Sequence, residues 1–139
     1  MVKRALVAVV VLLLGFVGLM WWALESSGVA VVETERADGS RRSTHVWYVV
    51  RDGELWLEAG TPENGWFRDV GTTPRLTLRS DGRVAEYVPE PMRDPSAHGR
   101  IRLWLRDKYG FRDRWVALIF DTSRSVAVRL LPPAPTGSG

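Results

Sequence analysis

An uninterrupted apolar stretch near the N-terminus constrains this chain more than any other feature of its sequence. Residues 5–24 carry no charged side chain, and their only polar side-chain groups are the indoles of Trp21 and Trp22. Twenty residues of α-helix extend over about 30 Å, the thickness of the hydrocarbon core of a bilayer. The stretch therefore predicts a single membrane-spanning signal-anchor helix within residues 1–25.

The residues on either side of this stretch predict its orientation. Lys3 and Arg4 precede it, whereas acidic residues, beginning with Glu25, follow it. Because basic flanks stay on the cytoplasmic side, the rest of the chain is expected outside the cytoplasm. A cleaved secretory signal is the alternative, with Gly28-Val29-Ala30 as the cleavage site. Since an ordinary signal core has only roughly 7–15 apolar residues, we expect a retained single-pass anchor.

The residues beyond the anchor predict one nearly neutral domain over 26–131. Of the 19 lysine and arginine residues, two precede the anchor, which leaves 17 against 16 acidic residues. Without a basic stripe to neutralise phosphates, nucleic-acid binding is not expected. The absence of cysteine excludes disulfides, thiolate metal sites and cysteine nucleophiles. The last residues, 132–139, are rich in proline, glycine and serine, which predicts a disordered tail.

Three Asp-Gly pairs punctuate the domain and predict hairpins, at Asp38-Gly39, Asp52-Gly53 and Asp81-Gly82. Each pair suits the positive φ angles of a tight type I′ turn. The flanking β-favouring stretches predict strands over 29–36, 42–51, 54–59, 75–79 and 83–88. The longer connection between the third and fourth strands contains a predicted helical turn that begins at Gly65.

The pattern of apolar residues predicts which strand faces are buried. Leu55 and Leu57 alternate with Glu54, Trp56 and Glu58, and residues 75–79 alternate in the same way. These strands should therefore bury one face and expose the other. Residues 46–50 are apolar throughout, so the second strand should be covered on both faces.

The second half of the chain predicts one or two helices and a last strand. The first helix should begin at Asp94 or Ser96 and end at Gly110. Four residues with helical spacing support it: Ile101, Trp104, Leu105 and Lys108. A short helix over 113–120 and a strand around 126–130 should follow. The predicted fold is mainly β (α+β), with six antiparallel strands that close into a small barrel and leave no exposed edge.

Catalysis by side chains has little support in the sequence. The only histidines, His45 and His98, are far apart, and the chain has no His-x-x-x-His spacing, nucleophile elbow or glycine-rich phosphate loop. We therefore predict no catalytic side chain and no metal site. His98 is expected to be a solvated residue in the first turn of its helix.

The entrance to the second strand is more informative. Arg41 and Arg42, followed by three polar residues, lead directly into the apolar residues 46–50. Such an arrangement can place donors for a phosphate at the mouth of an apolar pocket. On spacing alone, the alternative is a hairpin with solvated arginines.

This stretch belongs to a wider pattern that resembles the split β-barrel flavin and deazaflavin oxidoreductases, in particular their deazaflavin-dependent nitroreductase branch. The segments that carry the resemblance are 39–50, 53–60, 64–69, 74–78, 106–115 and 121–126. The resemblance implies a six-stranded antiparallel split β-barrel, here preceded by a single transmembrane helix. It also implies an enzyme that needs no catalytic side chain, because the cofactor carries the hydride.

The resemblance assigns site residues and partners. The residues expected at the cofactor site are Arg41, Arg42, Ser43, Thr44, His45, Gly60, Thr61 and Trp66. Trp47 and Tyr109 fall at the substrate site. The implied cofactor is FMN or a deazaflavin coenzyme, the implied substrates are small quinone-like or nitro compounds, and a homodimer is expected.

The chain departs from the family's pattern at three places, which leaves a second interpretation open. Residues 38–41 are shorter than the usual basic run, His45 replaces a usual proline, and Thr61 replaces a usual basic residue. The second interpretation is a non-catalytic split-barrel domain that binds a small apolar ligand, a lipid or a protein partner. A structural envelope protein without a ligand is the third.

Overall fold

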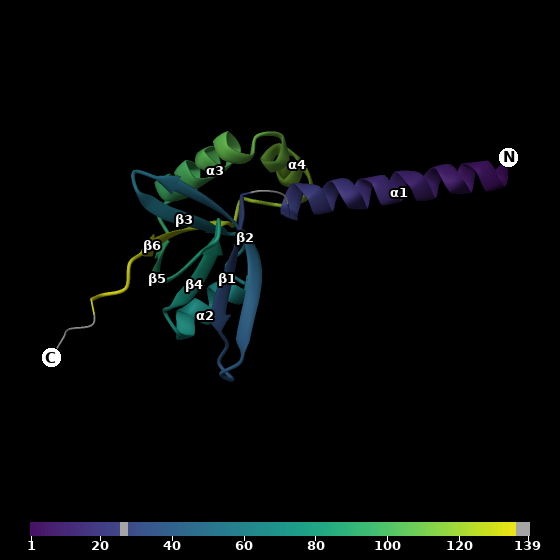
Figure 1. The fold of residues 1–139 in the computed structure, drawn as a ribbon. Helices are drawn as coiled ribbons and strands as arrows, with labels where there is room; N and C mark the ends of the chain where they lie inside the picture. The colour runs from purple at the N-terminus through teal and green to yellow at the C-terminus, as the bar shows by residue number, and fades with distance from the viewer. Residues whose placement is uncertain (26–27, 136–139) are drawn as a thin grey trace.

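The N-terminal helix α1 (Val2–Glu25) projects away from the rest of the protein in the computed structural model, which describes residues 1–25 and 28–135 (Figure 1). Over residues 2–21 it is long and apolar enough to cross a membrane, and none of these side chains is buried. The predicted apolar helix is confirmed. Cleavage after Ala30 would remove two residues from the first strand, where Ala30 is fully buried.

Six antiparallel strands form a closed barrel, as predicted. Their order around it is β1 (Val29–Glu35), β2 (Arg41–Arg51), β3 (Glu54–Ala59), β6 (Val126–Leu131), β5 (Arg83–Met92) and β4 (Leu76–Ser80), which pairs again with β1. β2 and β5 close the barrel, because each pairs with one strand along its first half and with another strand along its second half. β5 runs four residues past the predicted end because it pairs with β6 as far as Met92 and Ala127.

The three Asp-Gly pairs all lie in hairpin connections, although their turns differ. Asp52 and Gly53 have φ angles of 53° and 77°, and Asp81 and Gly82 have φ angles of 48° and 73°. Positive φ at both central residues is the type I′ geometry. In the first hairpin only Gly39 has a positive φ, and the turn closes through hydrogen bonds between Arg36 and both Gly39 and Ser40.

β2 contributes side chains to two separate apolar clusters. Val46 and Tyr48 belong to one cluster, whereas Val49 and the partly buried Trp47 belong to the other. The predicted two-sided coverage is therefore confirmed for these four residues. The two-sided coverage does not extend to Val50, whose side chain is 54% exposed.

Three helices follow α1 in the chain: α2 (Gly65–Thr72), α3 (Pro95–Tyr109) and α4 (Phe111–Ile119). α2 and α3 pack on the strands of the barrel, whereas α4 packs mainly on α3 and α1. The Asp94 carboxylate accepts a hydrogen bond from the Ala97 backbone N–H at 2.8 Å and caps α3, as predicted. Gly110, with φ 54°, separates α3 from α4. α4 begins two residues earlier than the sequence predicted.

The prediction that Trp56 lies on a solvent-exposed face of β3 is wrong. Trp56 is buried and makes an edge-to-face contact with Trp104 of α3, with 5.3 Å between the ring centroids. The reason is that α3 packs on β2, β3 and β6 and covers a face that the alternation had assigned to water. On β4 the predicted alternation holds, because Leu76 and Leu78 are buried.

The prediction that His98 is a solvated residue is also wrong. Its Nδ1 lies 3.0 Å from the Ser125 carbonyl oxygen and 3.2 Å from the Ser125 hydroxyl, and the side chain is partly buried. His98 therefore connects α3 to the start of β6. In the predicted tail, residues 132–135 have no helix or strand, and residues 136–139 lie outside the described residues.

Candidate functional site

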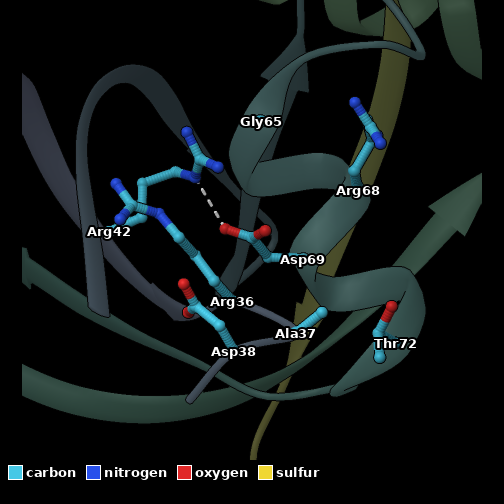
Figure 2. Close-up of a pocket in the computed structure, with 8 residues that line it drawn as sticks. All are labelled: Arg36, Ala37, Asp38, Arg42, Gly65, Arg68, Asp69 and Thr72. Atoms are coloured by element: carbon cyan, nitrogen blue, oxygen red, sulfur yellow. Dashed lines mark hydrogen bonds and ion pairs between the residues drawn. The ribbon is translucent and has the colours of Figure 1, made fainter. Parts of the chain in front are cut away.

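The start of α2 lies between two hollows in the protein surface. We call the first of them the arginine hollow. Its volume is about 360 Å³. It is lined by Arg36, Ala37, Asp38, Arg42, Gly65, Arg68, Asp69 and Thr72 (Figure 2). These residues come from the β1–β2 hairpin and from α2, so two segments that are distant in sequence form one concave surface.

The central contact of the arginine hollow is an ion pair between Arg42 and Asp69. Arg42 Nε lies 2.7 Å from Asp69 Oδ2 (Figure 2). The Thr34 hydroxyl donates to the same oxygen at 2.8 Å. The Asp69 side chain is only 9% exposed, against 33% for Arg42. Asp69 therefore holds the guanidinium of Arg42 from its buried side. The outer part of the guanidinium faces the hollow.

Gly65 makes this position of Arg42 possible. A Cβ atom on residue 65 would lie 2.5 Å from Arg42 Nη1 and 2.7 Å from its Cζ. Real Cβ atoms do not approach so closely, so any larger residue would displace the guanidinium. The absence of a side chain lets Arg42 rest directly on the first turn of α2.

The arginine hollow has an excess of positive charge. Its lining holds three arginines and two aspartates. Arg36 donates through Nη1 to the Ser40 hydroxyl at 3.2 Å, and its buried Nε has no acceptor among the described residues. Hydrogen bonds from the Ser40 side chain and backbone hold the pKa of Asp38 below its ordinary value. Planar guanidinium donors around such a space suit an oxyanion.

The second hollow, which we call the tryptophan hollow, has a volume of about 250 Å³. It is lined by His45, Val46, Trp47, Glu58, Asn64, Trp66 and Val116, which come from β2, β3, the segment before α2, α2 and α4. Trp66 is fully buried. Trp47 stacks on Tyr109, with 4.4 Å between the ring centroids and 14° between the planes.

Both tryptophans of this hollow carry a buried indole N–H without an acceptor. Neither Trp47 Nε1 nor Trp66 Nε1 has a hydrogen-bond partner among the described residues. A buried donor left unpaired costs about 1–3 kcal/mol. A ligand that reached these donors with carbonyl or ring-nitrogen acceptors would recover this free energy.

A buried ion-pair network includes Glu58, one of the residues that line the tryptophan hollow. Arg102 of α3 donates to both carboxylate oxygens of Glu58, at 3.0 and 2.8 Å, and to Asp113 of α4 at 2.6 Å. Burial by itself would lower the pKa of Arg102, but the charges and hydrogen bonds of Glu58 and Asp113 raise it above its ordinary value. The network fixes the two elements that supply Glu58 and Val116.

The structure brings only some of the predicted site residues together. His45, Trp47 and Trp66 meet in the tryptophan hollow, and Arg42 lies in the arginine hollow. Arg41 does not join Arg42, because successive side chains of a strand point to opposite faces. It lies in a separate groove, 3.9 Å from Glu33. Four other predicted residues are not among the described residues that line the two hollows: Ser43, Thr44, Gly60 and Thr61.

Tyr109 supports the tryptophan hollow from outside its lining. Its hydroxyl donates to the Gly28 carbonyl oxygen, lies 3.2 Å from the Tyr48 carbonyl oxygen and accepts a hydrogen bond from the Tyr48 N–H at 3.2 Å. Burial raises the pKa of Tyr109 to about 12. The hydroxyl is therefore engaged by backbone, and the ring acts by holding Trp47 in place.

Several lining residues were not identified from the sequence: Arg36, Glu58, Asn64, Gly65, Arg68, Asp69 and Val116. For Asp69 a signal existed. Trp66, Phe67 and Val70 form the apolar side of a short helix, and Asp69 shares their buried side. A carboxylate at a buried helical position requires a partner.

Comparison with known proteins shows the fold. No family model matches the chain, and no curated protein matches its sequence. Three solved structures are similar along most of their length. They are the conserved hypothetical protein Rv2991 of Mycobacterium tuberculosis (TM-score 0.60, 21% identity, 85% of this chain and 80% of that chain), an F420 reductase (0.52, 17%, 82% and 93%) and a protein of the pyridoxine phosphate oxidase family from Clostridium acetobutylicum (0.56, 17%, 79% and 78%).

The chain has the split-barrel fold of these proteins. The fold predicted from the sequence is thereby confirmed. Identities of 17–21% carry the architecture from one protein to another but not the ligand.

Proposed function

We propose that this protein is a membrane-anchored oxidoreductase that uses FMN or a deazaflavin to reduce quinone-like or nitro compounds. The tryptophan hollow carries the proposal. His45, Trp47 and Trp66, which the family resemblance assigns to the cofactor and substrate, line one cavity of this barrel. The similarity in fold to an F420 reductase agrees with this assignment.

The tryptophan hollow suits a planar ring system with polar edges. Trp47 supplies an aromatic surface, and Trp47 and Trp66 both carry a buried N–H donor that has no acceptor among the described residues. A flavin or deazaflavin ring carries carbonyl acceptors that match such donors, and when bound it supplies the hydride chemistry. The residues of this chain would orient the ring, exclude water from it and hold Glu58 at a fixed position beside it.

The arginine hollow suits the phosphate of the same cofactor. Asn64 and Trp66 line one hollow and Gly65 lines the other. A ligand with its ring in the tryptophan hollow would therefore have its chain at the start of α2, next to the guanidinium of Arg42. The positive excess of the arginine hollow favours a phosphate there. Arg41, in its separate groove, has no part in this phosphate site.

A non-catalytic binding domain is the second candidate, and one contact favours it. Arg42 already has a carboxylate partner in Asp69, which Thr34 holds in place. If that ion pair satisfies the guanidinium, the tryptophan hollow remains as a small cavity for an apolar ligand. A lipid or a protein partner would then replace the cofactor.

Titration of the full chain in detergent micelles with FMN and with a deazaflavin coenzyme tests the proposal. The expected result is saturable binding of one cofactor, seen in its visible absorption and in quenching of tryptophan fluorescence. Bound cofactor should also become reducible by a hydride donor. A folded protein that binds neither cofactor would leave the binding-domain interpretation.

We also propose that α1 is retained and that the barrel lies outside the cytoplasm, since Lys3 and Arg4 precede the apolar stretch. A C-terminal fusion to a reporter that is active on only one side of the membrane tests the orientation. The homodimer implied by the family resemblance is tested by the mass of the protein–detergent complex.

A further inference from the structure

The helix α4 exposes an apolar face that no described part of the barrel covers. Phe111, Leu118, Ile119 and Phe120 are exposed by 60, 81, 44 and 49%. Phe111, Trp115, Leu118 and Ile119 follow the spacing i, i+4, i+7 and i+8, which places them along one side of a helix. Phe111 and Trp115 stack on this side, with 6.2 Å between their ring centroids.

This apolar face is continuous with the apolar surface of α1. Trp115 lies 5.9 Å from Phe16 between ring centroids, and its Nε1–H donates to the sulfur of Met20 at 3.0 Å. Figure 1 shows α4 beside the end of α1 that is nearest the barrel. α4 therefore contacts the last turns of the helix that is long enough to span a bilayer.

The opposite side of α4 is fixed to α3. Asp113 is fully buried in its ion pair with Arg102, and Val116 lines the tryptophan hollow. The apolar face therefore cannot turn inward without breaking this ion pair. It stays directed away from the core, next to α1.

Arginines border the apolar face. Arg106 and Arg114 line a groove with Ala117 and Leu118. Long basic side chains reach from an apolar surface toward phosphate groups, and a helix of this kind lies in the plane of a membrane interface.

We propose that α4 is an interfacial helix whose apolar face is covered by the lipids of the same bilayer that α1 crosses. This inference rests on the proposed anchoring by α1. Lipid is favoured over a second copy of the chain because a protein that covered α4 would also have to cover the adjoining residues of α1. The tryptophan hollow, on the other side of Val116, would then lie close to the membrane surface. An apolar substrate dissolved in the bilayer would have only a short path to it.

The absence of cysteine allows a direct test. Leu118→Cys, labelled with an environment-sensitive fluorophore, is compared in the full chain with Leu12→Cys on α1 and with Val84→Cys on β5, whose residues are 73 and 56% exposed. The proteins are inserted into phosphatidylcholine–phosphatidylglycerol vesicles with brominated acyl chains. The probes at 118 and 12 should be blue-shifted and quenched by bromine, whereas the probe at 84 should show neither effect.

Three outcomes would overturn the inference. Quenching at 12 but not at 118 removes the interfacial helix and leaves the anchor, whereas quenching at neither position removes both. A blue shift at 118 that depends on protein concentration and is insensitive to bromine assigns the face to a second copy. If Leu118→Cys does not fold, Phe120→Cys gives the same readout. Since none of these measurements uses a cofactor, they are independent of the cofactor titration.

Discussion

Arg102 and Asp113 form a buried ion pair, with 2.6 Å between Nη2 and Oδ1, that fixes α4 to α3. Glu58 of β3 accepts from the other terminal nitrogen of the same guanidinium. One side chain therefore connects β3, α3 and α4. Through it the barrel sets the position of Val116 in the tryptophan hollow and the direction of the apolar face of α4.

Replacement of this arginine should destabilise the protein strongly. Arg102→Met leaves Glu58 and Asp113 buried without a cation, and removing one partner of a buried pair costs about 3–5 kcal/mol. The measurement is the free energy of unfolding in urea. Arg100→Met, an exposed residue of the same helix, is the control and should change this free energy by less than about 0.5 kcal/mol. Equal effects of the two substitutions would contradict the role of Arg102.

Two glycines of α2 provide a matched pair. Gly65→Ala places a Cβ 2.5 Å from Arg42 Nη1, whereas a Cβ on residue 71 meets no atom within 4 Å. Gly65→Ala should therefore displace Arg42 from Asp69 and weaken cofactor binding. Gly71→Ala should leave binding unchanged and stabilise the helix by up to about 1 kcal/mol. Urea unfolding and cofactor titration measure the two effects, and unchanged binding by Gly65→Ala would count against the phosphate role of Arg42.

The indole N–H of Trp66 can be tested separately from its ring. Trp66→Phe keeps an aromatic side chain but removes the buried donor, so affinity for the cofactor should fall by about 0.5–1.5 kcal/mol, or roughly 2- to 10-fold. Trp104→Phe, on α3 and outside the lining of the tryptophan hollow, is the control. Equal affinities of the two variants would remove the hydrogen bond from the proposal.

The phosphate assignment predicts a difference between FMN and riboflavin. Arg68 lines the arginine hollow and has no side-chain ion pair among the described residues, so Arg68→Ala removes charge without breaking a contact. It should weaken FMN by up to about 1–3 kcal/mol but leave riboflavin, which lacks the phosphate, unchanged. Arg83→Ala on β5 serves as the control. An equal loss for both ligands would indicate a change in the ring site instead.

The free energy of unfolding should first rise and then fall as the pH increases. Burial of the Lys108 ammonium, 3.4 Å from the Tyr48 ring centroid, lowers the pKa of Lys108 from 10.5 to about 8. Between these values the unfolded chain binds more protons, so the free energy of unfolding increases with pH. Because the side chain is only partly buried, solvent screening should keep this gain below about 1 kcal/mol.

Above pH 10 two tyrosines reverse the trend. Burial raises the pKa values of Tyr48 and Tyr109 from 10.0 to about 12, so the unfolded chain loses protons first and the free energy of unfolding decreases with pH. Urea unfolding of the wild type and of Lys108→Met measures both parts of the profile. The variant should lose the rise between pH 8 and pH 10 and keep the later fall. A rise that persists in Lys108→Met would assign it to another group.

The sequence alone determined the features that depend on neighbours along the chain. The apolar helix follows from twenty consecutive residues, and two type I′ turns follow from the Asp-Gly pairs at residues 52 and 81. Successive side chains of a strand point to opposite faces, so Arg41 and Arg42 also lie on opposite faces of β2. The sequence analysis had assigned both to one phosphate. These features arise within a few residues, where backbone preferences and hydrophobic periodicity act directly.

Only the tertiary structure decided which distant residues meet. Asp69 pairs with Arg42 across 27 positions, and Val116 enters the tryptophan hollow from the last helix. Trp56 is buried because α3 lies over its strand, a fact that the alternation within β3 does not contain. Such contacts depend on barrel closure and on the placement of α3 and α4 upon it. Burial and electrostatics between elements far apart in the chain set that placement, and no local pattern specifies it.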